Sequence, residues 1–253
     1  MRDLERKTEP SQFAAFVTER RSLLKWSSGA IVGALAFGGK LPGLDMATAF
    51  AKEGASTGNA VDLGEGDVGI LNYAYALEQL EAAFYTQVTK TPYGNMSSAD
   101  RDILTGIRDH EIAHRDFLKA ALKKNAIPDL EVDFSKVDFN NRNSVLTTGL
   151  TFENLGVAAY NGAGHLLKKA EYLLLAGKIV SVEARHAAAL RYSLKTKDQT
   201  SDNGDQANGS NANMPASVVN DKGLDQALVP SAVLATAGPF VSTPISANHL
   251  ASR

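Results

Sequence analysis

The 253-residue sequence contains no cysteine, only one tryptophan and no long apolar run. Without cysteine the chain cannot form disulfides, thiolate zinc sites, iron–sulfur clusters or a thiol nucleophile. The net charge of -2 argues against a nucleic-acid partner, which normally requires a clustered basic surface. What is present is a globular composition, 44% hydrophobic and 21% charged, in which His, Asp, Glu and Tyr must supply any chemistry.

Residues 1–51 have the pattern of an export signal. Arg20 and Arg21 precede two leucines, a lysine and a weakly apolar stretch, and Ala49 and Ala51 offer an A-x-A cleavage site. The segment resembles a bacterial twin-arginine (Tat) signal peptide, which implies export by the twin-arginine machinery to the periplasm or the extracellular space. The alternative is an ordinary apolar helix after a chance arginine pair. The stretch holds about 12 apolar residues, and a membrane span needs roughly 20, so we expect no stable span after cleavage.

Four later stretches show the three-to-four residue apolar spacing of amphipathic helices. They cover roughly 66–90, 98–125, 143–166 and 170–196. Short loops join the first two and the last two, whereas a long non-helical connection follows the second. This order predicts an all-α fold, an antiparallel four-helix bundle over 66–196 with one long crossover, as in ferritin-like proteins.

The remaining segments are assigned by composition. Residues 52–65 are expected to be a flexible lead-in, and the stretch 64–69 matches a dinucleotide fingerprint only in its letters, because no strand precedes it. Residues 197–222 are rich in Asn, Gly and Ser, as is typical of a flexible linker. Residues 223–253 are an apolar segment that we expect to dock on the bundle, with Pro230 opening a short helix.

Ionisable side chains lie on the inward stripe of all four predicted helices. They are one glutamate on each helix and a histidine three residues after the second and the fourth glutamate: Glu78, Glu111, His114, Glu153, Glu183 and His186. Residues three apart share a helix face, and buried carboxylates are normally paired, protonated or metal-bound. Four carboxylates and two imidazoles meeting inside a bundle suit two Fe or Mn ions per chain, with Zn as a competitor. The alternatives are surface i,i+3 pairs, or a vacant, degenerate site.

The first and third helices share a second spacing, because Tyr85 and Tyr160 each follow the helix glutamate by seven residues. The sequence therefore contains two similar halves, each with Glu-x6-Tyr on one helix and Glu-x-x-His on the next. Glu81 breaks the repeat, since the third helix has Gly156 at the equivalent position. His110 is expected to face away from the glutamate stripe, as a surface residue.

These motifs resemble the ferritin-like superfamily, and most closely its exported ferritin-like-domain proteins related to desiccation-related proteins. The stretches that carry the resemblance are YALEQLEAAFY, DHEIAHRDFL, TFENLGVAAYNGAG and SVEARHAAALR. The resemblance implies that Glu78 and Glu153 are terminal metal ligands and that Glu111 and Glu183 bridge two metals. It also implies that the ligand histidines, His114 and His186, cap one metal each, that Tyr85 and Tyr160 are outer-shell partners, and that Glu81 is either an extra ligand or a salt-bridging neighbour.

The expected function is redox chemistry on O2, peroxide or Fe2+ in an exported, stress-linked protein, either as a di-iron oxidase or peroxidase or as a manganese-catalase-like enzyme. The alternative is a non-catalytic desiccation or stress protein whose metal site is structural or vacant. Iron storage ranks last, because storage ferritins form cages and usually lack an export signal. The expected partners are metal ions and the export machinery, and a homodimer is compatible with the sequence.

Overall fold

The structure is a computed structural model of the whole chain, and it describes residues 60–196, 219–220 and 222–250. The proposed export signal, with Arg20 and Arg21, lies outside the described residues, as do most of the polar linker and the first part of the lead-in. Among the described residues, no helix is long and apolar enough to cross a membrane.

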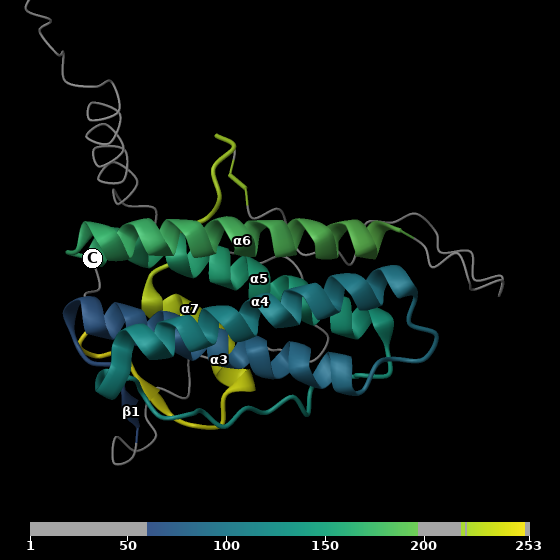
Figure 1. Cartoon of the computed structure of the whole chain (residues 1–253), viewed down its shortest axis with the longest axis horizontal. Helices are drawn as coiled ribbons and strands as arrows, with labels where there is room; N and C mark the ends of the chain where they lie inside the picture. Colours follow the sequence, from purple (N-terminus) through teal and green to yellow (C-terminus); the bar gives the residue numbers. More distant parts are fainter. Residues whose placement is uncertain (1–59, 197–218, 221, 251–253) are drawn as a thin grey trace, which may run out of the picture. The chain divides into compact units, whose positions relative to one another are not determined.

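Four long helices form the bundle (Figure 1): α3 (Gly66–Lys90), α4 (Ser98–Leu122), α5 (Arg142–Ala163) and α6 (Ala170–Lys195). α4 and α5 are each followed by a 3-10 turn, η2 (Lys123–Asn125) and η3 (Gly164–Leu166). Short loops make α3 antiparallel to α4, and α5 antiparallel to α6, whereas residues 126–141 cross from one pair to the other. The predicted all-α bundle with one long crossover is confirmed.

The crossover is anchored by aromatic side chains that pack on α3. Phe84 contacts Phe134 and Phe139 of the crossover, and it also packs edge-to-face on Phe152 of α5. Such aromatic pairs contribute about 0.5–1.5 kcal/mol each beyond the burial of their area. The long connection therefore lies against the bundle and forms part of its core.

The C-terminal segment packs on α5 through α7 (Pro230–Ala237) and η4 (Gly238–Phe240). The amide of Leu228 donates to the carbonyl of Ala158, at 3.0 Å, and Phe240 packs edge-to-face on Phe152. Gly162 permits this approach, because a Cβ there would lie 1.8 Å from the carbonyl oxygen of Leu228.

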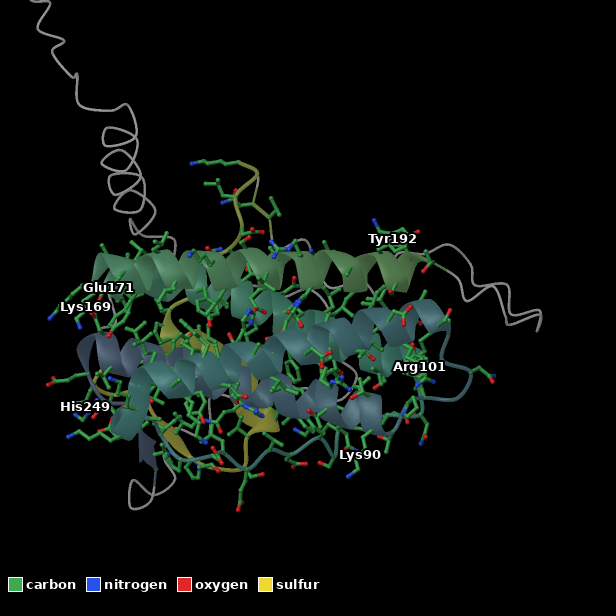
Figure 2. The ribbon with its side chains drawn as sticks, in the orientation of Figure 1. Lys90, Arg101, Lys169, Glu171, Tyr192 and His249 are labelled. Atoms are coloured by element: carbon green, nitrogen blue, oxygen red, sulfur yellow. The ribbon has the colours of Figure 1, made fainter. Side chains whose placement is uncertain are left out.

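The end of the lead-in is ordered, which corrects the expectation of a flexible segment up to residue 65. β1 (Val61–Asp62) pairs in parallel with β2 (Ile245–Ser246), and Leu63 is fully buried. The exposed His249 contacts Asp62 through Nδ1, at 3.0 Å (Figure 2). Burial of Leu63 and the pairing with β2 fix this segment, and neither is visible in its Gly-rich composition.

Candidate metal centre

The six side chains predicted as ligands come from all four long helices and meet inside the bundle. Each glutamate, one per helix, is fully buried: Glu78 on α3, Glu111 on α4, Glu153 on α5 and Glu183 on α6. His186 is 5% exposed and the His114 side chain 14% exposed. Other charged residues, such as Lys90, Lys169 and Glu171, point away from the bundle (Figure 2).

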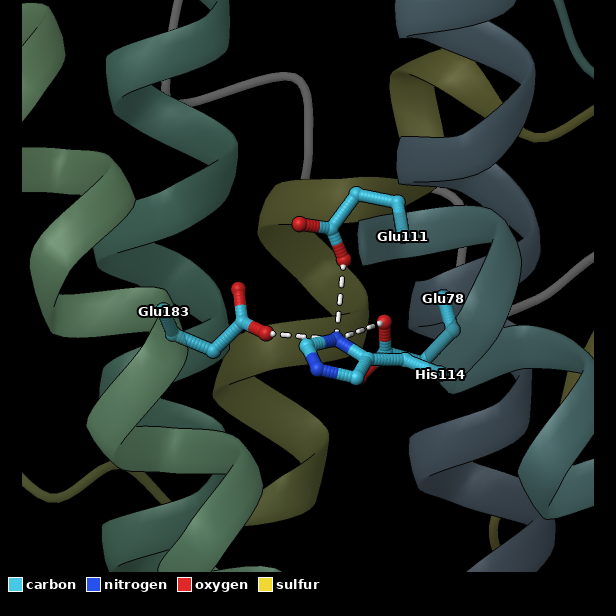
Figure 3. Close-up of side chains that lie close together, drawn as sticks. All are labelled: Glu78, Glu111, His114 and Glu183. Atoms are coloured by element: carbon cyan, nitrogen blue, oxygen red, sulfur yellow. Dashed lines mark hydrogen bonds and ion pairs between the residues drawn. The ribbon is translucent and has the colours of Figure 1, made fainter. Parts of the chain in front are cut away.

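One group of four residues gathers around the ring of His114 (Figure 3). The Nδ1 atom of His114 lies 3.4 Å from Oε2 of Glu78, 3.3 Å from Oε2 of Glu111 and 3.1 Å from Oε1 of Glu183. A ligand atom from each of the four residues lies within 4.8 Å of the others, which is a spacing that one metal ion can span.

A second group of four gathers around His186. Its Nδ1 atom lies 2.8 Å from Oε1 of Glu111, 3.2 Å from Oε2 of Glu153 and 4.0 Å from Oε2 of Glu183. These four residues also offer ligand atoms within 4.8 Å of one another.

Glu111 and Glu183 belong to both groups and present opposite oxygens to them. Oε2 of Glu111 faces His114 while its Oε1 faces His186, and the two oxygens of Glu183 are divided in the same way. A carboxylate in this position can bridge two ions. The arrangement is therefore two adjacent groups, each of which could hold an ion, with two carboxylates in common.

Two tyrosines cross-link the halves of the site. The hydroxyl of Tyr85 on α3 donates to Oε1 of Glu153 on α5, and that of Tyr160 on α5 donates to Oε1 of Glu78 on α3, each at 2.5 Å. Hydrogen bonds to the outer side of ligand carboxylates orient them. Each tyrosine thus orients the glutamate that belongs to only one of the two groups.

Glu81 is also buried, at 3% exposure, and it has no ion pair among the described residues. The interpretation of Glu81 as a salt-bridging neighbour is therefore wrong. Its Oε1 atom has no hydrogen-bond partner, and it lies 3.4 Å from the position that a Cβ on Gly156 would occupy. The absence of a side chain at Gly156 makes room for this fifth carboxylate.

Burial controls the protonation of three of the glutamates. It raises the pKa of Glu78, Glu81 and Glu153 well above the ordinary value of 4.5, and the neighbouring carboxylates raise the pKa further. A carboxyl group with a raised pKa holds its proton to a higher pH than an exposed glutamate does.

The pKa values of Glu111 and His114 shift in the directions that favour the charged form of each, because the two side chains pair with each other. Burial alone would raise the pKa of Glu111, but hydrogen bonds from His114 and His186 outweigh it and lower the pKa to about 2. Burial alone would lower the pKa of His114, but the three carboxylates around its Nδ1 atom outweigh this effect and raise the pKa to about 12. The centre therefore combines one charged pair with glutamates whose pKa is raised, and a divalent cation would compete with protons for these carboxylates.

These residues fit a pair of metal ions. One N–H of His114 can donate to only one of the three carboxylates around it, and both oxygens of Glu183 and Oε2 of Glu78 have no hydrogen-bond partner. Buried acceptors are normally satisfied, and a cation is a partner that would satisfy this cluster of carboxylate oxygens. The donor set of carboxylate oxygen and imidazole nitrogen suits Fe or Mn, with Zn as a competitor.

His110 corrects an expectation made from the sequence. It is exposed, as predicted, but it does not point away from the site, because its Nδ1 atom lies 2.8 Å from Nε2 of His186. Its position four residues before His114 was the available signal, since residues four apart share a helix face. Its partner on α6 could not be identified without the packing of α4 against α6.

An apolar cavity of about 30 Å3 lies beside the centre, between the four long helices. Tyr160, which binds Glu78, forms part of its wall together with Leu77, Phe117 and Ile179. The apolar lining of this cavity favours small apolar molecules over water.

The comparison with known protein families agrees with this geometry. Residues 66–196, just over half of the chain, match the ferritin-like domain, and the match begins and ends with the bundle. No match to a curated protein was found. With the four-helix bundle and the shared carboxylate–histidine groups, this match shows that the chain belongs to the ferritin-like domain family.

Proposed function

We propose that the protein holds two Fe or Mn ions and acts in redox chemistry on O2, peroxide or Fe2+. The observation that carries the proposal is the sharing of Glu111 and Glu183 by two adjacent groups, each completed by its own histidine. Two ions held there would supply the redox equivalents for that chemistry. Because Fe2+ oxidation and peroxide disproportionation bring their own electrons, neither needs a separate donor protein.

The residues of the chain have distinct roles in this proposal. Glu78 and Glu153 each serve one ion, and the tyrosine bonded to each fixes its orientation. The apolar cavity beside Tyr160 offers space for a small uncharged reactant such as O2.

We further propose that the protein is exported by the twin-arginine route to the periplasm or beyond, and that its role is protection against oxidative or drying stress. The export signal rests on residues 1–51, and the stress role rests on the resemblance to the desiccation-related group. The alternative is a non-catalytic stress protein, which the charged pair of Glu111 and His114 favours, because this pair stabilises part of the cluster without a metal.

Metal analysis of the purified protein tests the proposal. We expect two Fe or Mn ions per chain, lost in both Glu111→Gln and Glu183→Gln, because each change removes a ligand common to both sites. The control is Glu171→Gln, which alters an exposed carboxylate on α6 and should leave the metal content unchanged. A metal-free wild-type chain whose thermal stability does not respond to Fe2+ or Mn2+ would contradict the proposal.

Turnover then separates an enzyme from a scaffold. The loaded wild-type chain should consume H2O2 or oxidise added Fe2+ in the presence of O2, and the two Gln variants should not. A loaded chain that does neither would support the non-catalytic alternative.

A further inference from the structure

A second histidine lies at the outer edge of the His186 ring. Nδ1 of His110, on α4, lies 2.8 Å from Nε2 of His186, on α6, and the two rings meet edge to edge, with centroids 5.1 Å apart and planes 15° apart. The inner nitrogen of His186, Nδ1, faces Glu111 and Glu153. His186 is therefore held on both edges of its ring.

The two nitrogens of His186 constrain each other. If Nδ1 gives its lone pair to a metal, the ring proton must be on Nε2, and Nε2 then donates to Nδ1 of His110. An acceptor at the outer nitrogen fixes the tautomer and the ring orientation of a ligand histidine and raises its basicity. Metal binding at Nδ1 and the hydrogen bond to His110 thus favour the same tautomer of His186, the one with its proton on Nε2.

His114 has no equivalent support. The second half of the chain repeats the first, with Glu183 and His186 in place of Glu111 and His114, and by the same offset Val182 takes the place of His110. Valine has no acceptor. Among the described residues, no hydrogen bond is made to Nε2 of His114, whose polar contacts all involve Nδ1.

We propose that His110 is a positioning residue for His186 and makes the two metal positions unequal. The position formed with His186 and Glu153 binds its ion more tightly than the position formed with His114 and Glu78. This inference rests on the proposed dinuclear site. The protein then passes through a state with one ion, beside His186, before the second ion binds.

A calorimetric titration of the metal-free full chain with Mn2+ alone tests the inference, because it measures the affinity of each binding step. The wild type should bind two ions with two different affinities. His110→Ala should weaken the tighter step by about 10- to 100-fold and leave the weaker one close to its wild-type value. His110→Asn should restore the tighter step, because the amide oxygen of asparagine can occupy the place of Nδ1. The control is His165→Ala, which changes an exposed histidine in η3.

The location of the first ion gives a second readout. Anomalous scattering from crystals grown with one equivalent of Mn2+ should place the ion beside His186. The inference is overturned if the first ion lies beside His114, if His110→Ala changes neither step or both steps alike, or if His110→Asn fails to restore binding. If the wild type binds two ions and the His110 variants bind them with the same affinities, only this inference is overturned. If the wild type binds no Mn2+, the proposed function is overturned as well.

Discussion

At the scale of single residues, the site departs from its own symmetry at Glu81. The equivalent position on α5 is Gly156, and the space left there accommodates the Glu81 carboxyl group next to Glu183. Because this carboxyl group is buried among other carboxylates, its pKa lies well above 4.5 in the folded chain. The unfolded chain releases the proton near pH 4.5, so the stability contributed by protonated Glu81 is fully present below that pH and is lost as the pH rises towards the folded pKa.

We therefore predict that Glu81→Gln stabilises the metal-free protein and that the gain grows as the pH rises above 4.5. Each pH unit between the unfolded and the folded pKa adds up to about 1.4 kcal/mol, because glutamine has no proton to release. Urea unfolding at several pH values between 5 and 8 measures the gain. Glu171→Gln, at an exposed position, should show no such trend. A Glu81→Gln variant that loses stability as the pH rises, in parallel with the wild type, would contradict the raised pKa.

At the scale of secondary-structure elements, a polar network outside the candidate metal centre fixes the starts of α4 and α5 and the end of α6. The side chain of Ser97 caps α4, and that of Asn141 caps α5. The Arg142 guanidinium donates to Asp100 of α4, at 2.6 Å, and to the carbonyl of Ser193 in α6, at 2.7 Å. One residue thus ties three helices together at one end of the bundle.

We predict that Arg142→Ala destabilises the protein by about 3 kcal/mol, because it leaves the buried carboxylate of Asp100 without its cation. Burial raises the pKa of Asp100, but Arg142 and Tyr93 outweigh it, and the pKa lies below 3.8 in the folded chain. Asp100 therefore contributes stability above pH 3.8, which is lost as the pH falls through the folded pKa, and the variant should lose less stability in acid than the wild type. Chemical unfolding at pH 7 and below about pH 3 measures both effects, with the exposed Arg101→Ala as a control.

The helices themselves were predictable from the sequence because their apolar spacing is regular. The predicted ranges 66–90 and 170–196 agree with α3 and α6 to within one residue. The other two predicted ranges included the 3-10 turns η2 and η3, since 3-10 turns are frequent at the C-terminal ends of α-helices and the sequence pattern does not distinguish the two. The Arg142 network was not predicted, because its partners come from three separate helices.

At the scale of the whole molecule, the candidate metal centre draws on all four long helices: one group of possible ligands spans α3, α4 and α6, and the other spans α4, α5 and α6. A ligand that binds only the folded chain stabilises it in proportion to the logarithm of its concentration. A cation competes with protons for the buried glutamates whose pKa is raised, so its binding should strengthen as the pH rises.

We predict that Mn2+ at 100 times its dissociation constant raises the melting temperature by about 5–10 °C. Binding at that concentration adds about 2.7 kcal/mol to the free energy of unfolding, and each kcal/mol raises the melting temperature by about 2–4 °C. Calorimetry in two buffers with different ionisation enthalpies should detect proton release on binding, and the shift in melting temperature should be larger at pH 8 than at pH 6. The same measurements on Glu183→Gln should show neither effect. Binding without proton release would show that the glutamates are already ionised.

The sequence by itself determined the helix faces and the set of ionisable residues on them. Helical periodicity is local, so a spacing of three places Glu183 and His186 on one face whatever surrounds them. The absence of cysteine left carboxylate and imidazole as the strong ligands for a metal. The tertiary structure decided which groups meet across helices: Tyr85 with Glu153, Tyr160 with Glu78, His110 with His186, and Glu81 with the space at Gly156. These contacts depend on how each helix is rotated and shifted against its neighbours, and the spacing of residues along one helix does not contain that information.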